Sequence, residues 1–173
     1  MSENADYICL RCSRVNPTCC CLPPGQEKSF FPLSHNEINE IDNYLKGNDF
    51  FVRETNDRNF LTRLTKILPA PGKLINERFP LDNFHFRLKT YSDGRCVLLT
   101  QKGCMLPVDI RPVYCRLYPF WLHNNRLTFL IDPSCLAQEG NTSLRDLVNL
   151  FAVDPNKILL DFNLLLSNFE LNS

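Results

Sequence analysis

Apolar residues recur every three or four positions in several segments of the chain, a spacing typical of helices that bury one face. This spacing predicts helices over about 34–46, 57–68, 143–152 and 154–169. Ser34 and Glu37 stand as in a capping box, and Gly47 follows as a stop signal. A further helix of about two turns is expected after Arg111-Pro112, because proline is favoured at the first helical position and Pro119 limits the helix.

Short apolar stretches predict strands in the middle of the chain, and the first of them also alternates apolar with polar residues. They are expected over 86–91, 96–100 and 127–131. Asp93-Gly94 and the stretch from Gln101 to Gly103 supply turns between them. Residues 73–85 show no regular pattern, and Pro23-Pro24-Gly25 favours a loop at the end of the first 25 residues. The sequence therefore predicts an α+β fold, with a short antiparallel sheet from residues 86–131 flanked by helices.

Length and composition indicate one ordinary globular domain. The chain has 173 residues, of which 44% are apolar and 22% charged, so we expect residues 1–173 to form a single domain. Lys plus Arg and Asp plus Glu number 19 each, so the net charge is zero, and we expect no nucleic-acid partner and no membrane partner. The first residues lack the pattern of a secretory signal, which predicts a cytoplasmic protein.

The cysteine content sets this chain apart from an average domain. The nine positions are Cys9, Cys12, Cys19, Cys20, Cys21, Cys96, Cys104, Cys115 and Cys135. An odd number without an export signal argues against disulfides, and scattered core cysteines do not explain five in so short a polar segment. Cys9-x2-Cys12 has the spacing of a metal-binding knuckle. We therefore predict a thiolate centre for zinc or an iron–sulfur cluster.

The later cysteines stand in specific motifs. These are Asp93-Gly94-Arg95-Cys96, then Gly103-Cys104, then Arg111-Pro112-x2-Cys115-Arg116-x-Tyr118-Pro119-Phe120, and finally Cys135 after a strand. Together with the first knuckle, this set resembles the CxxCxxCC family of zinc- or iron-chelating proteins, also called YkgJ-type cysteine-cluster proteins. The resemblance covers about residues 8–140, which it implies are the metal-binding core, followed by C-terminal helices over about 143–170.

The chain departs from the family pattern in the second knuckle. Six residues, Ser13 to Thr18, follow Cys12 where the family has two, and three cysteines come next instead of two. Either Cys19-Cys20 or Cys20-Cys21 fills the paired position, and we favour Cys20-Cys21 because a Leu-Pro-Pro stretch follows it directly. The resemblance then implies eight metal ligands: Cys9, Cys12, Cys20, Cys21, Cys96, Cys104, Cys115 and Cys135.

Eight thiols suffice for two centres of four ligands, or for one centre beside reduced cysteines. A buried four-thiolate centre carries negative charge that needs compensation. Arg111 and Arg116 flank ligand positions, and we expect them to bind the cofactor and offset its negative charge. Arg95 is a further candidate for this role. His35, His85 and His123 form no convincing ligand set, with His123 the nearest in sequence to a ligand cysteine.

The leading functional hypothesis is a metal-binding protein that holds an iron–sulfur cluster, with zinc as the alternative cofactor. A second hypothesis is a structural zinc module that binds a protein partner, because the last helix is apolar over much of its surface. A third is a cluster-dependent methyl transfer, by analogy with flagellin lysine methylases that contain a similar segment. The sequence identifies no catalytic residue, and the chain has no recognisable phosphate loop or nucleophile elbow.

Overall fold

The computed structural model describes residues 10–14, 19–27, 30–124, 126–140 and 142–171, and its fold is α+β. Besides a helical turn at residues 10–12, the helices are α2 (His35–Leu45), α3 (Arg58–Ile67), α4 (Gly72–Arg78), α5 (Val113–Leu117), α6 (Leu144–Phe151) and α7 (Pro155–Asn168). The strands are β1 (Phe51–Thr55), β2 (Phe84–Leu88), β3 (Leu99–Thr100), β4 (Gly103–Cys104), β5 (Phe120–His123) and β6 (Arg126–Phe129). Short 3-10 turns are η2 (Val108–Ile110) and η3 (Leu136–Gln138).

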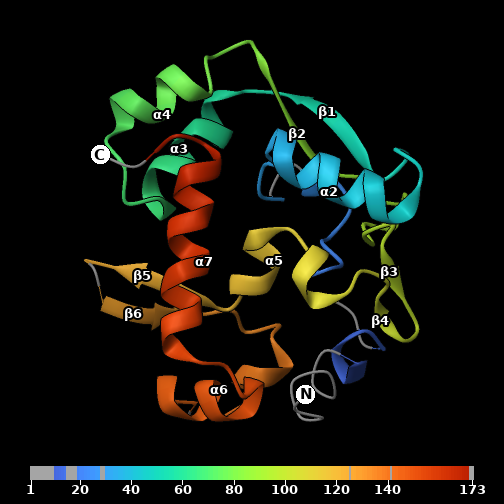
Figure 1. The fold of residues 1–173 in the computed structure, drawn as a ribbon, viewed down its shortest axis with the longest axis vertical. Coiled ribbons are helices and arrows are strands. Elements are labelled where there is room, and N and C mark those ends of the chain that lie inside the picture. Colours follow the sequence, from blue (N-terminus) through green and yellow to red (C-terminus); the bar gives the residue numbers. More distant parts are fainter. Residues whose placement is uncertain (1–9, 15–18, 28–29, 125, 141, 172–173) are drawn as a thin grey trace.

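The elements form two groups with α5 between them (Figure 1). Helix α7 runs along one group, with α3 and α4 near its C-terminal end, the β5–β6 hairpin beside it and α6 near its N-terminal end. The other group holds α2, the β1–β2 pair and the small β3–β4 hairpin. Because α5 packs against α7 and precedes β5 directly, it links the group of the last helix to the middle of the molecule.

The predicted helices are confirmed, and their ends follow from the capping residues. Ser34 and Glu37 form the expected capping box of α2, and Ser143 forms one with Asp146 at α6. Helix α2 ends at Lys46 in the left-handed conformation, one residue before the expected glycine. These side chains satisfy backbone N–H groups that have no partner inside the helix, so the ends can be read from sequence.

The prediction of one sheet over residues 86–131 is wrong in its pairing. Within the described residues the strands form three separate two-stranded antiparallel sheets: β1 with β2, β3 with β4, and β5 with β6. The partner of β2 is β1, in which Phe51 pairs with Leu88, and the sequence analysis did not predict β1. The expected strand over 96–100 is reduced to β3, because Cys96 forms only an isolated bridge with Thr90 around the Asp93-Gly94 turn.

The expectation of irregular structure over residues 73–85 is also incomplete. Helix α4 occupies the first half of this stretch, and Ile75 is fully buried in it. The helix has seven residues and no side-chain cap at Pro71, so its formation depends on packing rather than on local signals. A periodic pattern cannot be seen over two turns, which explains why the sequence did not reveal it.

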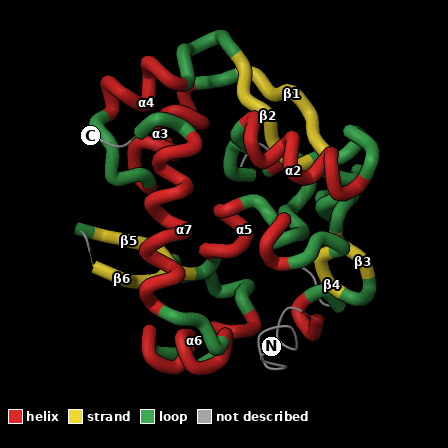
Figure 2. The backbone as a smooth tube through the Cα atoms, viewed as in Figure 1, coloured by secondary structure: helices red, strands yellow, loops and turns green. Residues whose placement is uncertain are grey.

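The buried apolar side chains form two clusters. The larger one joins α3, α4, α5, α7 and β5, and its largest fully buried side chains include Phe120 and Phe162. The smaller one joins α2, β2 and the loop around Cys96, and includes Ile41, Leu98 and Leu106. Loops drawn in green in Figure 2 carry the chain between the two clusters. Seven of the cysteines line a cavity whose walls include residues of both apolar clusters.

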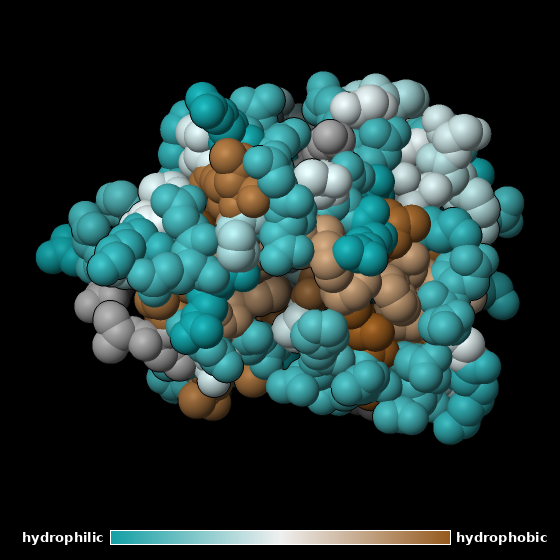
Figure 3. Space-filling view, turned by 90° about the horizontal axis from the view of Figure 1, so that it is seen from above, coloured by the Kyte–Doolittle hydropathy of each residue, from teal (hydrophilic) through white to brown (hydrophobic). Residues whose placement is uncertain are grey.

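The surface carries scattered apolar side chains. On the face seen in Figure 3, brown apolar patches are separated by teal hydrophilic side chains. On α7, Leu160 is 69% exposed and Leu164 is 44% exposed, while Phe162 between them is buried. Across the described part of the chain, none of the helices has the length and apolarity needed to cross a bilayer.

His85 on β2 supplies a pH test of this fold. Its ring is buried and stacks on Phe60 with 3.9 Å between ring centroids, and its Nδ1 lies 2.8 Å from Oδ1 of Asn56. Burial lowers the pKa of His85 to about 4. Below the ordinary pKa of about 6.5, the unfolded chain therefore takes up a proton that the folded state refuses, so stability falls as the pH falls from about 6.5 to about 4.

We predict that this loss reaches roughly 2 kcal/mol at pH 4.5 and is removed in His85→Gln. Urea unfolding of both proteins at pH 7.5 and pH 4.5 measures it. The stability advantage of the wild type over the variant should shrink by that amount at the lower pH. An advantage that stays constant between the two pH values would contradict the buried neutral histidine.

Candidate metal centre

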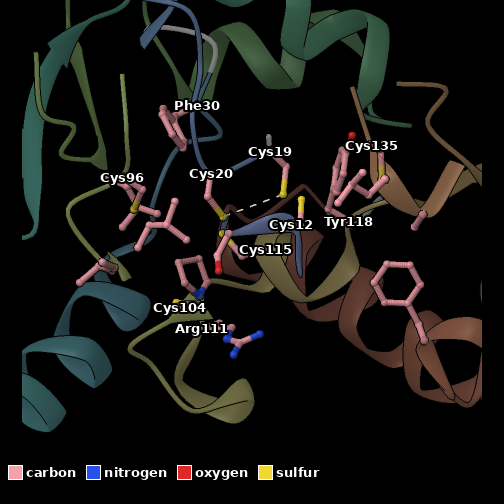
Figure 4. Close-up of a pocket in the computed structure, with 18 residues that line it drawn as sticks. Cys12, Cys19, Cys20, Phe30, Cys96, Cys104, Arg111, Cys115, Tyr118 and Cys135 are labelled. Carbon is pink, nitrogen blue, oxygen red and sulfur yellow. Dashed lines mark hydrogen bonds between the residues drawn. The ribbon is translucent and has the colours of Figure 1, made fainter. Parts of the chain in front are cut away.

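Cysteine side chains converge on one internal cavity of about 110 Å³ (Figure 4). Those lining it are Cys12, Cys19, Cys20, Cys96, Cys104, Cys115 and Cys135. Cys9, the first residue of the predicted knuckle, lies outside the described residues. One water needs roughly 10–15 Å³ of such space, so the cavity has room for a group much larger than a single ion.

The cysteines reach the cavity from segments that are far apart in sequence. Cys12 ends a helical turn of residues 10–12, Cys96 follows the Asp93-Gly94 turn, Cys104 lies in β4, Cys115 in α5, and Cys135 just before η3. Most of these positions lie at turns or at the ends of elements. The cavity therefore depends on tertiary packing of the whole chain, and no single loop forms it.

The paired cysteines that face the cavity are Cys19 and Cys20. Their sulfur atoms lie 3.9 Å apart. Cys21 points elsewhere: it is buried, pairs in an isolated bridge with Arg95, and does not line the cavity. The structure thus places the pair one residue before the one that the sequence analysis favoured: Cys19 and Cys20 share a turn at the cavity, whereas Cys21 is engaged in the bridge with Arg95.

The thiols of Cys19 and Cys115 face the space of the cavity. Burial raises the pKa of Cys115 well above its ordinary value, and the hydrogen bond with Cys20, followed by burial, does the same for Cys19. Both residues are nevertheless exposed by accessible surface. Both side chains line the cavity, so their accessible surface faces this space, while the cavity walls surround the two thiols with protein.

Four of the thiols are close electrostatic neighbours, and we call Cys20, Cys96, Cys104 and Cys115 the four-thiol group. After burial, the strongest influences raising the pKa of Cys115 are Cys20, Cys96 and Cys104. Burial raises the pKa of Cys96 to about 12, and Cys20 and Cys104 add to it. Repulsion between thiolates weakens with distance, so these mutual effects mark the four as neighbours among the cavity thiols, with Cys19 beside Cys20.

Backbone N–H groups donate to several of the sulfur atoms. The N–H two residues further along donates to the thiol at three positions: Leu98 to Cys96, Leu106 to Cys104, and Ala137 to Cys135. Each of these hydrogen bonds lowers the thiol pKa, against the effect of burial. Such N–H donors stabilise a thiolate and tune the potential of an iron–sulfur cluster when they surround its ligands.

The two arginines predicted to compensate the centre have different positions. Arg111 lines the cavity, its Nε donates to the carbonyl of Leu106 at 3.0 Å, and its charge lowers the pKa of Cys104 and Cys20. Arg116 does not line the cavity. Its guanidinium pairs with Asp161 of α7 at 3.1 Å, with both side chains largely buried, and so joins α5 to α7.

Other predicted candidates lie away from the cavity. Arg95 forms an exposed pair with Asp93, and the three histidines do not line the cavity. Among the described residues, no three His, Cys, Asp or Glu side chains stand at the spacing that one bound metal ion requires. Two thiolates on one tetrahedral zinc lie about 3.8 Å apart, and within the described chain this spacing is found between Cys19 and Cys20.

Tyr118 is a lining residue whose role the sequence analysis did not identify. Its hydroxyl donates to Oδ2 of Asp132, and Asp132 also accepts from the backbone and hydroxyl of Ser134. Burial and this hydrogen bond raise the pKa of Tyr118 above its ordinary value. The phenol therefore stays protonated and fixes one wall of the cavity beside Cys135 (Figure 4).

Glu37 positions the helix that carries Cys115. This buried carboxylate accepts hydrogen bonds from the backbone and hydroxyl of Ser34, and its Oε1 accepts from the N–H of Val113 at 2.8 Å. It thus caps its own helix α2 and also the start of α5, where Pro112 supplies no side-chain cap. The capping box was visible in the sequence, but its link to Val113, 76 residues further along, was not.

Comparison with known proteins adds no assignment: no family model, no curated protein and no solved structure matches this chain. The resemblance to the cysteine-cluster family therefore stays a prediction based on the motifs. The arrangement of the cavity is an independent observation. It brings together cysteines that those motifs had marked from widely separated positions.

We predict that Glu37→Ala lowers the free energy of unfolding by roughly 2–4 kcal/mol, because the N–H groups of Ser34 and Val113 lose their buried acceptor. Glu40→Ala on the exposed face of α2 is the matched control and should change it by less than about 0.5 kcal/mol. Urea unfolding of the three proteins measures both effects. Equal stability of the two variants would show that the carboxylate does not join α2 to α5.

Proposed function

We propose that this protein is an iron–sulfur protein that holds a [4Fe–4S] cluster in the cysteine-lined cavity. The observation that carries the proposal is the convergence of seven cysteine side chains, from segments between residues 12 and 135, on one internal space. Within it, the four-thiol group supplies the number of protein ligands that such a cluster takes. Because thiolate ligands need a reducing compartment, the proposal includes a cytoplasmic location.

The number of lining cysteines and the size of the cavity favour a cluster over one zinc ion. In a cluster, iron and sulfide stand between the cysteine ligands and keep the thiolate sulfur atoms well apart, whereas one zinc ion draws its thiolates together. Within the described part of the chain, no three candidate ligands have the close spacing of a single-ion site. The cavity is also larger than one ion needs.

The surroundings of the cavity suit a negatively charged centre. Its walls include the apolar residues Phe30, Leu98 and Phe151, which exclude water and strengthen electrostatic effects. Arg111 brings a positive charge to the thiols, and the N–H groups of Leu98 and Leu106 point at ligand sulfur atoms. These groups would offset part of the negative charge of the thiolates, and the metal ions would offset most of it.

The remaining cavity thiols extend the proposal without changing its basis. Cys12, Cys19 and Cys135 line the same space as the four-thiol group. One four-iron cluster needs four thiolates, so these three are available to a second metal ion or stay as reduced thiols. The cluster would supply one-electron chemistry, and the chain's own residues would bind it, orient it and exclude water.

The test is an anaerobic preparation of the wild type and three single variants. We expect about four iron and about four sulfide per wild-type chain, and loss of most of both in Cys96→Ser and Cys115→Ser. Cys21→Ser is the matched control, because Cys21 is a buried cysteine outside the cavity, and it should keep both. Stoichiometric zinc without sulfide would overturn the cluster and favour the structural zinc alternative.

A second prediction concerns stability, because the cavity lies between the two apolar clusters. Removing the metal should lower the melting temperature of the whole chain by on the order of 10 °C, since bound metal contributes to the free energy of folding. Cys115→Ala should cause a loss of similar size. Calorimetry with and without a chelator measures it. A metal-free protein that melts like the loaded one would contradict a centre that joins the two clusters.

A further inference from the structure

A second cavity shares a wall with the cysteine cavity. It has a volume of about 420 Å³ and lies between residue 10 and the β3–β4 hairpin with the loop that follows it. Its lining residues are Leu10, Lys102, Gly103, Cys104, Met105, Leu106, Pro107, Val108 and Arg111. Cys104 and Arg111 line both cavities, so one layer of side chains separates them. We call this second space the outer groove.

The charges of the outer groove have one sign. Lys102 and Arg111 bring two positive charges, and no Asp or Glu is among the lining residues. Within the described chain, neither cation takes part in an ion pair. The Nε of Arg111 is held by the carbonyl of Leu106, which fixes the orientation of the guanidinium plane. The Arg111 side chain also hydrogen-bonds the Cys104 thiol, and a guanidinium with five N–H donors keeps others that a carboxylate can accept from.

The other walls of the outer groove are apolar. Met105 is 47% exposed and Val108 is 44% exposed, and both line the groove with Leu10 and Pro107. Two cations beside exposed apolar side chains match a small molecule with an anionic end and a short hydrocarbon chain. An inorganic dianion would use the two charges but would leave the apolar walls uncovered.

We propose that the outer groove binds a small aliphatic carboxylate, with its carboxylate on Arg111 and Lys102 and its hydrocarbon chain against Met105 and Val108. The binding itself needs only groups that the chain supplies. That the bound carboxylate would lie beside a cluster rests on the proposed function, because Cys104, which lines both spaces, is a member of the four-thiol group. A bound carboxylate would then add negative charge beside the centre and make its reduction less favourable.

The test is isothermal titration of the full chain as purified, with butyrate as the probe and butyramide, of the same shape but uncharged, as its control. We expect a dissociation constant in the millimolar range for butyrate, and binding at least about tenfold weaker for butyramide. Arg111→Gln and Lys102→Glu should each weaken butyrate binding by about tenfold or more. Lys66→Ala changes an exposed lysine of α3, on the opposite side of Figure 1, and should leave it unchanged.

Several results would overturn the proposal: no butyrate binding at tens of millimolar, equal binding of butyramide, or unchanged binding in Lys102→Glu, which alters only an exposed side chain. Inorganic phosphate that binds more tightly than butyrate would also overturn it. Iron and sulfide are measured in each preparation. If butyrate binds to a protein that contains no iron, the carboxylate site is supported and the cluster is contradicted. If an iron-loaded protein does not bind butyrate, the cluster is supported and the carboxylate site is contradicted.

Discussion

The structure depends on one electrostatic constraint: thiolates cannot gather in an apolar cavity without positive charge among them. Burial and mutual repulsion raise the pKa of Cys96 and Cys115, so without a cation these thiols stay protonated. Arg111 and a few N–H groups offset only part of this cost. The proposed metal centre would remove the rest, because a bound metal displaces the protons and brings its own charge. The metal ions of this centre would also join the two apolar clusters, which are otherwise connected through loops.

The irregular parts of the fold follow from this arrangement. The cavity cysteines come from separate places along the chain, and turns and short elements aim these single side chains inward. The five-residue helix α5 is an example: Glu37 caps it from α2, and Arg116 ties it to Asp161 on α7. It is therefore held from both groups of elements, and Cys115 is oriented by contacts on either side of the cavity.

Local signals in the sequence were enough to predict the helices with capping residues. Ser34, Ser143 and Asp154 each mark a helix start that the structure confirms. The strand pairing was not predictable in the same way, because β1 and β2 are joined by two helices and their register depends on packing. Helix α4 was missed since two turns carry too little periodicity. The motifs, in contrast, identified most of the lining cysteines, while the choice between Cys19 and Cys21 as the partner of Cys20 required the direction of the side chains.

The central claim is that the cavity holds iron with sulfide, and X-ray absorption at the iron and zinc edges of the anaerobically purified protein tests it most directly. The account predicts an iron edge whose fine structure contains a sulfur shell and a second shell from neighbouring iron atoms. A zinc edge with four sulfur atoms at about 2.3 Å, and no iron signal, would contradict it.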